Sequence, residues 1–515
     1  MQRALTRPAA STSGGIRIRS PLLALALATL VVVGATSLFT QASERTSAAL
    51  DDPAGASSMD ATFLSFDGTP IVVTVYRPAG ASAATPVPII LHSHGWSGTR
   101  IADGSGLPGR LWAEGYGVVT IDARGHGDSG GYATVHHKDT EVKDFIAVLD
   151  WIHDELDWVQ REPTSGAPKD IVAGAAGYSY GGAFQLMTAS YDARLDALAP
   201  EITWADLPYA LAPANVTKSI WVDFLYGIAK QSGTRIDPRI DEWYWQAMLT
   251  NELPAAAIAH FRGSNPVHEE IRADVLLIQG IPDVLFNLNQ AQMNFERLSE
   301  HEANDVRLFT HLTGHVLPYA QPLGSTFERR NTFLDEGPCG SNADVVVAWM
   351  DEKLRGIQGA ADDIARVSYA LEDGGCLRLD ALPDDTITTT FPAILAPSAG
   401  GSLLIPLAEG PLLVAGIPRL EATVDALGVG GTAHASLVVV SPTGFTRVVD
   451  DQATPFRATP GAPLGFDLAG VATRLDAGDQ LLLRIDGVNE WYAHNSARVP
   501  GGALLHDVRV TLPVV

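Results

Sequence analysis

The chain has 515 residues, of which 46% are hydrophobic and 18% are charged. It is therefore long enough for two or three folded domains and too apolar for a disordered protein. Its formal net charge of -24 leaves no basic surface to neutralise phosphates, which argues against nucleic acid as a partner. Beyond that, the acidity indicates little more than solubility.

The N-terminus has the residue order of an export signal. Four arginines precede an apolar run at 21–33, and small and polar residues follow through Ser43. The stretch from Pro21 to Phe39 is also close to the minimum length of a membrane anchor. Residues 1–43 are thus expected to be a cleaved signal peptide, which we favour, or an N-terminal anchor. Either way the remainder is expected to be secreted or held at the cell surface, after a linker at 44–58.

Residues 59–364 alternate between strand and helix patterns. The clearest helix places Val142, Phe145, Leu149 and Ile152 on one face, at the spacing of an amphipathic helix. Short, continuous apolar runs predict strands that are covered on both faces, at 71–76, 87–92, 117–122, 170–176, 275–279 and 306–310. Strands that alternate with helices predict a parallel α/β sheet.

The most informative segment lies between the fourth of these strands and a helix pattern. Residues 177–181 read Gly-Tyr-Ser-Tyr-Gly, which is the G-x-S-x-G pattern of a nucleophile elbow. The sharp turn needs glycines because larger neighbours would clash with the strained Ser backbone. We therefore interpret Ser179 as a nucleophile, with a tight turn around a buried Ser as the alternative.

An acyl-transfer transition state carries an oxyanion, which needs donors that are already in place. The amide of Tyr180, directly after Ser179, is one candidate. The second is expected from the loop after the strand at 87–92, where the amide of Trp96 follows His94 and Gly95. His94 is expected to have a structural role in this loop.

Residues 201–265 break the alternation, because they are rich in aromatic residues and contain no convincing strand. The segment is predicted to be a helical cap over the carboxyl end of the sheet, where open α/β folds bind ligands. Most of its aromatic side chains are expected in the core of the cap, and a few at a substrate pocket.

A serine nucleophile needs a base and an acid, which follow it in the order Asp, His in α/β-hydrolases. Asp283 follows the strand at 275–279 and a tight turn, and His315 follows the strand at 306–310 and a loop. Capping of a following helix is the alternative role for Asp283. Asp128 is a weaker candidate acid because it precedes Ser179, and His311 is a weaker base because it sits at the strand end.

The last part of the chain, 365–515, changes character. Short strand patterns separated by Gly, Pro and Asp predict an all-β sandwich or jelly roll. The two cysteines, Cys339 and Cys376, are an even number in an exported protein, which favours one disulfide over two free thiols. Neither lies at a spacing from His or Asp that is typical of a metal site, and no metal is expected.

These motifs together resemble the X-prolyl dipeptidyl aminopeptidase and cocaine-esterase group of serine hydrolases. The resemblance rests on the segments 121–131, 177–182, 280–283 and 314–315, and on the β patterns near the C-terminus. It implies an α/β-hydrolase domain with a helical cap, followed by a C-terminal jelly roll. Members often use a tyrosine hydroxyl as an oxyanion donor. Because Trp96 has no hydroxyl, two backbone amides are expected here.

Aminopeptidase members of the group hold the free ammonium of a substrate with acidic residues. Glu201 and Asp206, at the start of the expected cap, are the weak candidates for that role, with a solvated or helix-capping role as the alternative. If they are not used in this way, the dipeptidyl-peptidase activity does not follow from the resemblance, and the sequence leaves peptidase versus esterase open.

The sequence therefore predicts an exported serine hydrolase that cleaves an ester or amide in a small molecule or short peptide. Ser179 is the expected nucleophile, His315 the base and Asp283 the acid that orients it, and no cofactor is expected. The first alternative is an X-Pro dipeptidyl-peptidase. The second is a surface binding protein with a degenerate hydrolase fold, against which the ordered triad argues. The sequence leaves the oligomeric state open.

Overall fold

The computed structural model describes residues 55–161, 168–315, 336–397, 401–427, 431–458, 461–495 and 502–515. The expected export segment at 1–43 lies outside these residues, as does most of the expected linker. Within the described ranges, no helix is both long and apolar enough to cross a membrane.

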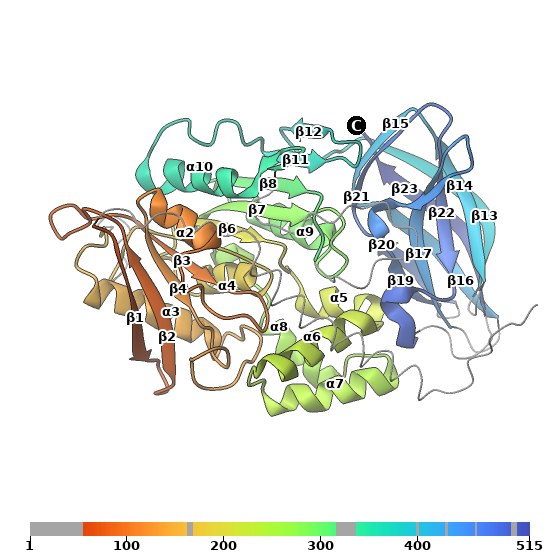
Figure 1. The fold of residues 1–515 in the computed structure, drawn as a ribbon. Coiled ribbons are helices and arrows are strands. Elements are labelled where there is room, and N and C mark those ends of the chain that lie inside the picture. The colour runs from red at the N-terminus through yellow and green to blue at the C-terminus, as the bar shows by residue number, and fades with distance from the viewer. Residues whose placement is uncertain are drawn as a thin grey trace, which may run out of the picture. The chain divides into compact units, whose positions relative to one another are not determined.

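The first domain is built on a ten-stranded mixed sheet (Figure 1). Neighbouring strands from β4 to β11 run parallel, whereas β1 and β2 at one edge and β12 at the other pair antiparallel. In spatial order the strands are β1 (Ser57–Leu64), β2 (Pro70–Arg77), β4 (Gly117–Ile121), β3 (Ile89–Ser93), β5 (Ala173–Tyr178), β6 (Ala197–Glu201), β7 (Asp274–Gly280), β8 (Val306–His311), β11 (Val367–Ala370) and β12 (Cys376–Leu379).

Helices cover both faces of this sheet, which explains why its central strands are continuous apolar runs. All residues of β3, β4 and β6 are buried. Helices α2 and α10 pack together on one face, and α3 and α4 pack together on the other (Figure 1). The helices of this domain are α2 (Gly106–Ala113), α3 (Glu141–Glu155), α4 (Tyr180–Ala189), α9 (Leu288–Leu298) and α10 (Asn342–Arg355). A short hairpin, β9 (Glu336–Gly337) and β10 (Gly340–Ser341), precedes α10.

The expected helical cap is present between β6 and β7 (Figure 1). It is helical because its apolar residues recur at helix spacing and because Asp206 and Asp237 cap α5 and α7 with their side chains. The cap comprises α5 (Leu207–Leu211), η1 (Pro213–Asn215), α6 (Ser219–Ser232), α7 (Pro238–Thr250) and α8 (Ala255–Arg262), and η2 (His268–Glu270) leads back to the sheet. The strand β6 occupies 197–201, so the cap begins later than the predicted residue 201.

The C-terminal domain is made of antiparallel sheets whose inward faces share one hydrophobic core. One sheet has the order β13 (Thr386–Pro397), β23 (Gly502–Pro513), β16 (Arg419–Leu427) and β20 (Pro463–Asp467). The other contains β14 (Ser402–Glu409), β22 (Gln480–Asp486), β17 (Gly431–Val440), β18 (Thr446–Val448) and β19 (Thr454–Ala458). A pair, β15 (Leu412–Gly416) and β21 (Val471–Leu475), and two short turns, η3 (Val449–Asp451) and η4 (Glu490–Asn495), complete the domain. The expected α/β domain with a C-terminal β domain is confirmed.

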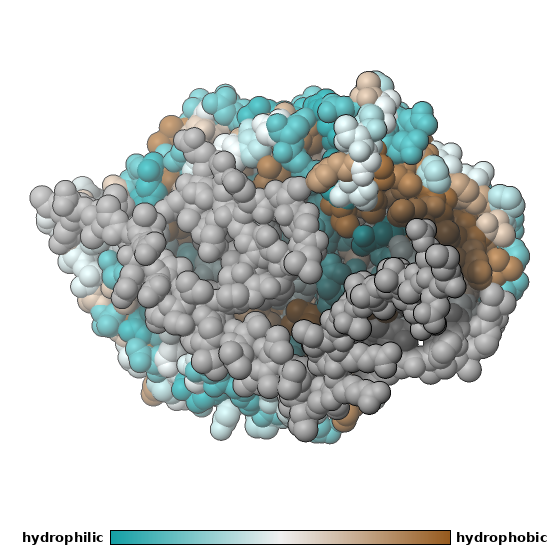
Figure 2. Space-filling view, turned by 45° about the vertical axis from the view of Figure 1, so that its right-hand side comes forward, coloured by the Kyte–Doolittle hydropathy of each residue, from teal (hydrophilic) through white to brown (hydrophobic). Residues whose placement is uncertain are grey.

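Some hydrophobic residues of the C-terminal domain are exposed. Figure 2 shows hydrophobic surface, in brown, at the right of the view. The exposed large hydrophobic residues of this domain include Leu395 on β13 and Leu404 on β14. Because isolated exposed leucines are common on soluble proteins, we assign them no function.

Two boundaries differ from the predictions. The first domain begins with β1, which takes up the end of the expected linker and pairs with β2 along its whole length. At the other end, β11 and β12 belong to the first sheet, because β11 pairs parallel with β8. The C-terminal domain therefore starts at β13, at Thr386, and not at 365. Two short strands without a following helix look the same in sequence whichever sheet they join.

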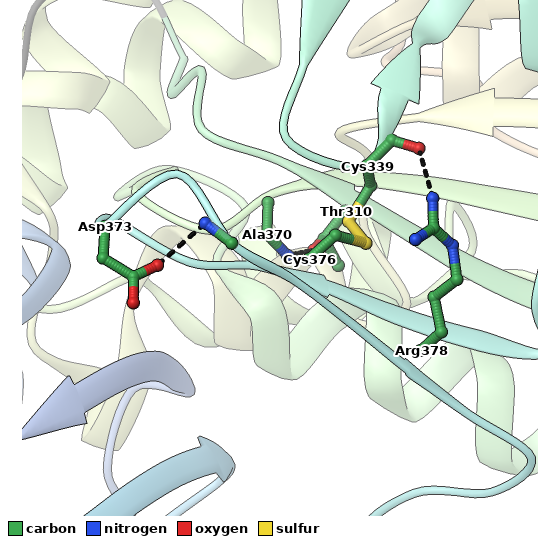
Figure 3. The surroundings of a disulfide bond; sticks show 7 residues. Thr310, Cys339, Ala370, Asp373, Cys376 and Arg378 are labelled. Carbon is green, nitrogen blue, oxygen red and sulfur yellow. Dashed lines mark hydrogen bonds between the residues drawn. A yellow bond between two sulfur atoms is a disulfide. The ribbon is translucent and has the colours of Figure 1, made fainter.

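Cys339 and Cys376 form a disulfide (Figure 3). It joins the chain just before α10 to the first residue of β12, so it ties the edge hairpin to the sheet. Arg378 on β12 donates a hydrogen bond to the Cys339 carbonyl at 3.4 Å, and the Ala370 amide donates to Thr310 Oγ1 at 2.8 Å (Figure 3). The cysteines thus stabilise the edge that the sequence had assigned to the next domain.

Candidate active site

The backbone at Ser179 forms the sharp turn between β5 and α4. Ser179 has a φ of +56°, in the left-handed region that residues with a side chain rarely adopt. A Cβ on Gly181 would lie 2.1 Å from the Ser93 carbonyl oxygen, and a Cβ on Gly182 would lie 2.6 Å from that of Glu201. Both glycines are therefore required for the turn to pack against the strands beside it. The turn presents the Ser179 side chain at the carboxyl edge of the sheet.

The structure brings Ser179, His315 and Asp283 together from three separate loops. His315 Nε2 lies 2.8 Å from Ser179 Oγ, and His315 Nδ1 is hydrogen-bonded to Asp283 Oδ2. Asp283 is fully buried and Ser179 is 8% exposed. This chain of hydrogen bonds has the connectivity of a Ser-His-Asp triad.

Two glycines allow the acid and base loops to meet. A Cβ on Gly280 would lie 1.7 Å from the Thr313 carbonyl oxygen, and a Cβ on Gly314 would lie 2.8 Å from that of Pro282. Any larger residue at either position would therefore push the segment that carries His315 away from the segment that carries Asp283.

Asp283 does not cap the following helix, since α9 begins at Leu288 with Asn287 as its N-cap, but its carboxylate also holds the local loop. Its Oδ1 accepts hydrogen bonds from the amides of Leu285 at 2.8 Å and Phe286 at 2.9 Å, while its Oδ2 faces His315. Because a carboxylate can only accept, His315 must carry a proton on Nδ1. Its Nε2 is then free to accept the Ser179 hydroxyl proton.

The two expected oxyanion donors lie beside Ser179. Tyr180 is the first residue of α4, and the first amides of a helix have no acceptor within it. Trp96 sits in a turn closed by a 2.9 Å hydrogen bond from the Gly98 amide to the Gly95 carbonyl, with Ser97 at a φ of +65°. Both residues line the same cavity as Ser179.

The expected structural role of His94 is visible in its contacts. Its Nε2 accepts from the Ala123 amide at 3.1 Å, so the proton is on Nδ1, which donates to the Gly95 carbonyl at 2.8 Å. Burial lowers the pKa of His94, which keeps the ring neutral in this arrangement. The loop that carries Trp96 is thereby joined to the strand end at Ala123.

Sequence reasoning missed His136, which supports the other oxyanion candidate. His136 Nε2 donates to the Tyr180 carbonyl at 2.7 Å, and the two rings stack with centroids 3.6 Å apart. Burial lowers the pKa of His136 to about 3, so the ring is neutral. No local motif marks this residue, because its partner Tyr180 is on α4, 44 positions later in the chain. Val135 and His136 both adopt a positive φ, which places strained backbone next to the site.

A cavity of about 110 Å³ extends from Ser179 into the cap. None of the described residues that line it carries a charge. The indole nitrogen of Trp96 donates to the Leu225 carbonyl at 2.9 Å and that of Trp204 donates to the Ser264 carbonyl at 2.7 Å, so both rings present apolar faces. Its aromatic lining residues are Trp96, Tyr180, Trp204, Tyr226, Trp243, Tyr244, Phe261 and Phe286.

Neither Glu201 nor Asp206, the weak candidates for an ammonium site, lines this cavity. Glu201, at the end of β6, accepts a 2.9 Å hydrogen bond from Asn342 and lies 3.2 Å from His311. Asp206 accepts from the Tyr209 amide and caps α5. Asp206 thus has the helix-capping role given as its alternative, whereas Glu201 is buried and is neither solvated nor a helix cap.

The rival acid and base candidates lie elsewhere. Asp128 is exposed and pairs with Arg100 at 2.8 Å, away from Ser179 and His315. His311 is buried beside Glu201, and its Nδ1 accepts from the Thr313 amide at 3.1 Å.

Comparison with known proteins places this geometry in a family. Residues 67–317 match the X-Pro dipeptidyl-peptidase (S15) family. This match places residues 67–317, just under half of the chain, among the serine hydrolases of that family. Proteins of Mycobacterium bovis and Mycobacterium tuberculosis that are described as serine esterases are each 24% identical to it over 232 residues. That match covers 39% of this chain and about a third, 35%, of each relative.

Solved structures share the fold of this chain across both domains. A CocE/NonD family hydrolase from Staphylococcus aureus has a TM-score of 0.65 at 13% identity, covering 88% of this chain and 93% of its own. An α-amino acid ester hydrolase has a TM-score of 0.61 at 15% identity, covering 91% and 98%. An aminopeptidase from a marine sediment Thaumarchaeota archaeon has a TM-score of 0.60 at 14% identity, with the same coverage. At these identities the likeness establishes the fold alone.

Proposed function

We propose that this protein is a serine esterase that acts on neutral, apolar esters through Ser179, His315 and Asp283. The observation that carries the proposal is the 2.8 Å contact between Ser179 and His315 at the mouth of an uncharged cavity. The alternative of a degenerate hydrolase used only for binding is disfavoured, because all three groups lie within hydrogen-bonding distance in the required order.

In the first half of the reaction Ser179 Oγ attacks the ester carbonyl and its proton passes to His315 Nε2. Asp283 stabilises the imidazolium through Nδ1. The amides of Tyr180 and Trp96 donate to the oxyanion, which is the charge that develops in the transition state. The tetrahedral intermediate collapses to an acyl-enzyme, and His315 gives its proton to the departing alcohol.

In the second half a water molecule attacks the acyl-enzyme. His315 takes a proton from the water, and the new tetrahedral intermediate collapses to release the carboxylic acid and to return a proton to Ser179. No metal or cofactor takes part in this scheme.

The cavity favours a short apolar group next to the scissile carbonyl. An apolar cavity of about 150 Å³ holds one benzene ring, so a cavity of about 110 Å³ suits a smaller acyl group. A substrate with a free ammonium would lose its hydration there without a carboxylate to replace it, which costs several kcal/mol. This is our reason for ranking the esterase above the X-Pro dipeptidyl-peptidase that the family name describes.

The test compares nitrophenyl esters of increasing acyl length with an Ala-Pro anilide, using Ser179→Ala as the control. We expect turnover of the short esters, a fall for long acyl chains, and little turnover of the anilide. A preference for the anilide that is lost when its amine is blocked would instead establish the dipeptidyl peptidase.

We also propose that the protein is exported, as its N-terminal sequence indicates. The Cys339–Cys376 disulfide supports this location, since such bonds persist in oxidising compartments. N-terminal sequencing of the protein from medium and membrane fractions distinguishes a cleaved signal from an anchor. An intact N-terminus in the cytoplasmic fraction would contradict export.

A further inference from the structure

The loop at 280–286, which carries Asp283, has an unusual set of hydrogen-bond partners. Its carbonyl oxygens accept from three buried side chains, each of which bridges two of them. These side chains are Gln279, Lys218 and Gln452, and they come from the sheet, the cap and the C-terminal domain respectively.

Gln279, on β7, is the local partner. Its Nε2 donates to the Gly280 carbonyl at 2.9 Å and to the Phe286 carbonyl at 2.8 Å, and its side chain is fully buried. It therefore joins the two ends of the loop and fixes its width.

Lys218, at the start of cap helix α6, is the second partner. Its Nζ donates to the carbonyls of Val284 and Leu285, both at 2.8 Å. The residue is 5% exposed, and burial lowers the pKa of Lys218 to about 8 while Asp283 opposes that shift. A buried ammonium costs free energy unless nearby groups accept its hydrogen bonds, and here the two loop carbonyls do so.

Gln452 is the third partner and comes from the C-terminal domain. Its Nε2 donates to the Asp283 carbonyl at 2.8 Å and to the Ile281 carbonyl at 3.3 Å, and the residue is 4% exposed. The two residues before it, Asp450 and Asp451, adopt φ values of +53° and +54°. Non-glycine residues in that region cost free energy, so the chain is strained where it delivers Gln452 to the loop.

We propose that Lys218 and Gln452 are positioning residues for Asp283, so that the cap and the C-terminal domain are both part of the catalytic machinery. The inference rests on the role of Asp283 in the proposed function. Gln452 holds the carbonyls of Ile281 and Asp283, and Lys218 holds the two carbonyls that follow Asp283. The backbone of Asp283 is thereby fixed, with its Oδ2 directed at His315 Nδ1. Loss of either partner frees part of the loop and leaves carbonyl oxygens without their donor.

The same domain contact offers a matched control. Asn289, on α9, donates to the Leu468 carbonyl at 2.9 Å and accepts from the Gly470 amide at 2.8 Å. Like Gln452 it is buried and makes two hydrogen bonds across to the other domain, but neither of these bonds goes to the loop of Asp283. Asn289→Leu therefore weakens the domain contact while leaving the acid in place.

The experiment compares Lys218→Met, Gln452→Met and Asn289→Leu with the parent enzyme. Methionine matches the length of glutamine, is one atom shorter than lysine, and removes the donor in both variants. We expect Lys218→Met and Gln452→Met to lower kcat on a short nitrophenyl ester by about tenfold to a hundredfold, with KM within about twofold, because small misplacements of catalytic groups cost such factors. Asn289→Leu is expected to keep the parent kcat at a similar loss of thermal stability.

A second readout does not depend on turnover. The Nδ1 proton of His315, hydrogen-bonded to Asp283, is expected to give a low-field NMR resonance, assigned by its absence from His315→Ala. We expect this resonance to be lost or shifted in Lys218→Met and Gln452→Met and kept in Asn289→Leu.

The outcomes separate the two proposals. Equal kcat losses in Gln452→Met and Asn289→Leu, in proportion to their losses of stability, would overturn the positioning role. So would an unchanged His315 resonance in both methionine variants. If the parent shows no turnover that depends on Ser179, the proposed function fails, and the resonance alone still decides whether the two residues orient Asp283.

Discussion

Acidification is expected to destabilise the protein through His136, and His136→Gln isolates that effect. His136 is fully buried, and its folded-state pKa of about 3 lies below the ordinary value of 6.5. Between these values the unfolded chain binds a proton that the folded protein does not, so stability is lost as the pH falls below 6.5. Glutamine keeps an N–H donor for the Tyr180 carbonyl but does not titrate.

The loss in the free energy of unfolding follows from the pKa values of His136 in the folded and unfolded states. At pH 7.5 the unfolded histidine is almost entirely neutral, so its protonation removes almost no stability. At pH 5 protonation of the unfolded state removes about 2 kcal/mol of stability per such histidine. Other buried groups, such as Glu141, whose pKa is raised by burial, are the same in both proteins and cancel in the comparison.

The assay is urea unfolding of the parent and of His136→Gln at pH 7.5 and pH 5. At pH 7.5 the variant is expected to be the less stable of the two, because it loses the stacked ring on Tyr180. On moving to pH 5 the parent is expected to lose about 2 kcal/mol more than the variant. Parallel losses in the two proteins would refute a neutral, buried His136.

Three further changes have definite expected outcomes. Asp283→Asn removes the acceptor for His315 Nδ1–H and is expected to lower kcat by about ten-thousandfold, as in other triads, with a folded protein by circular dichroism. Gly181→Ala is expected to abolish the reaction of Ser179 with a fluorophosphonate probe, because the added Cβ would lie 2.1 Å from the Ser93 carbonyl oxygen and distort the turn. Labelling at the wild-type rate would contradict this. Replacing both Cys339 and Cys376 with serine opens a loop of 37 residues and is expected to cost about 4 kcal/mol in unfolding experiments. An unchanged unfolding midpoint in that variant would show that the edge hairpin is held without the bond.

Local patterns were sufficient to predict the parts of the fold that depend on local order. The Gly-Tyr-Ser-Tyr-Gly turn, the buried strands and the order of Asp283 and His315 are all readable from short segments. The structure gives Ser179, His315 and Asp283 the contacts that this interpretation requires. The cap was predicted as a helical insertion for the same reason, since its apolar spacing is local.

What the sequence did not reveal depends on contacts between distant segments. The strands β11 and β12 join the first sheet only through pairing with β8, which no local pattern encodes. His136, Lys218 and Gln452 act on backbone atoms far away in the chain, where any residue supplies the same carbonyl. Glu201 stands at the start of the segment that was predicted to form the cap. The structure instead pairs its carboxylate with Asn342 on α10 and His311 on β8, which are far away in the chain.

The measurement that tests the central claim most directly is labelling of the purified protein with a fluorophosphonate, followed by peptide mapping. An activated Ser179 is expected to be labelled at a single site, with no labelling in Ser179→Ala and much slower labelling in His315→Ala. Absence of labelling in a correctly folded protein, or equal rates with and without His315, would contradict the account of Ser179 as an activated nucleophile.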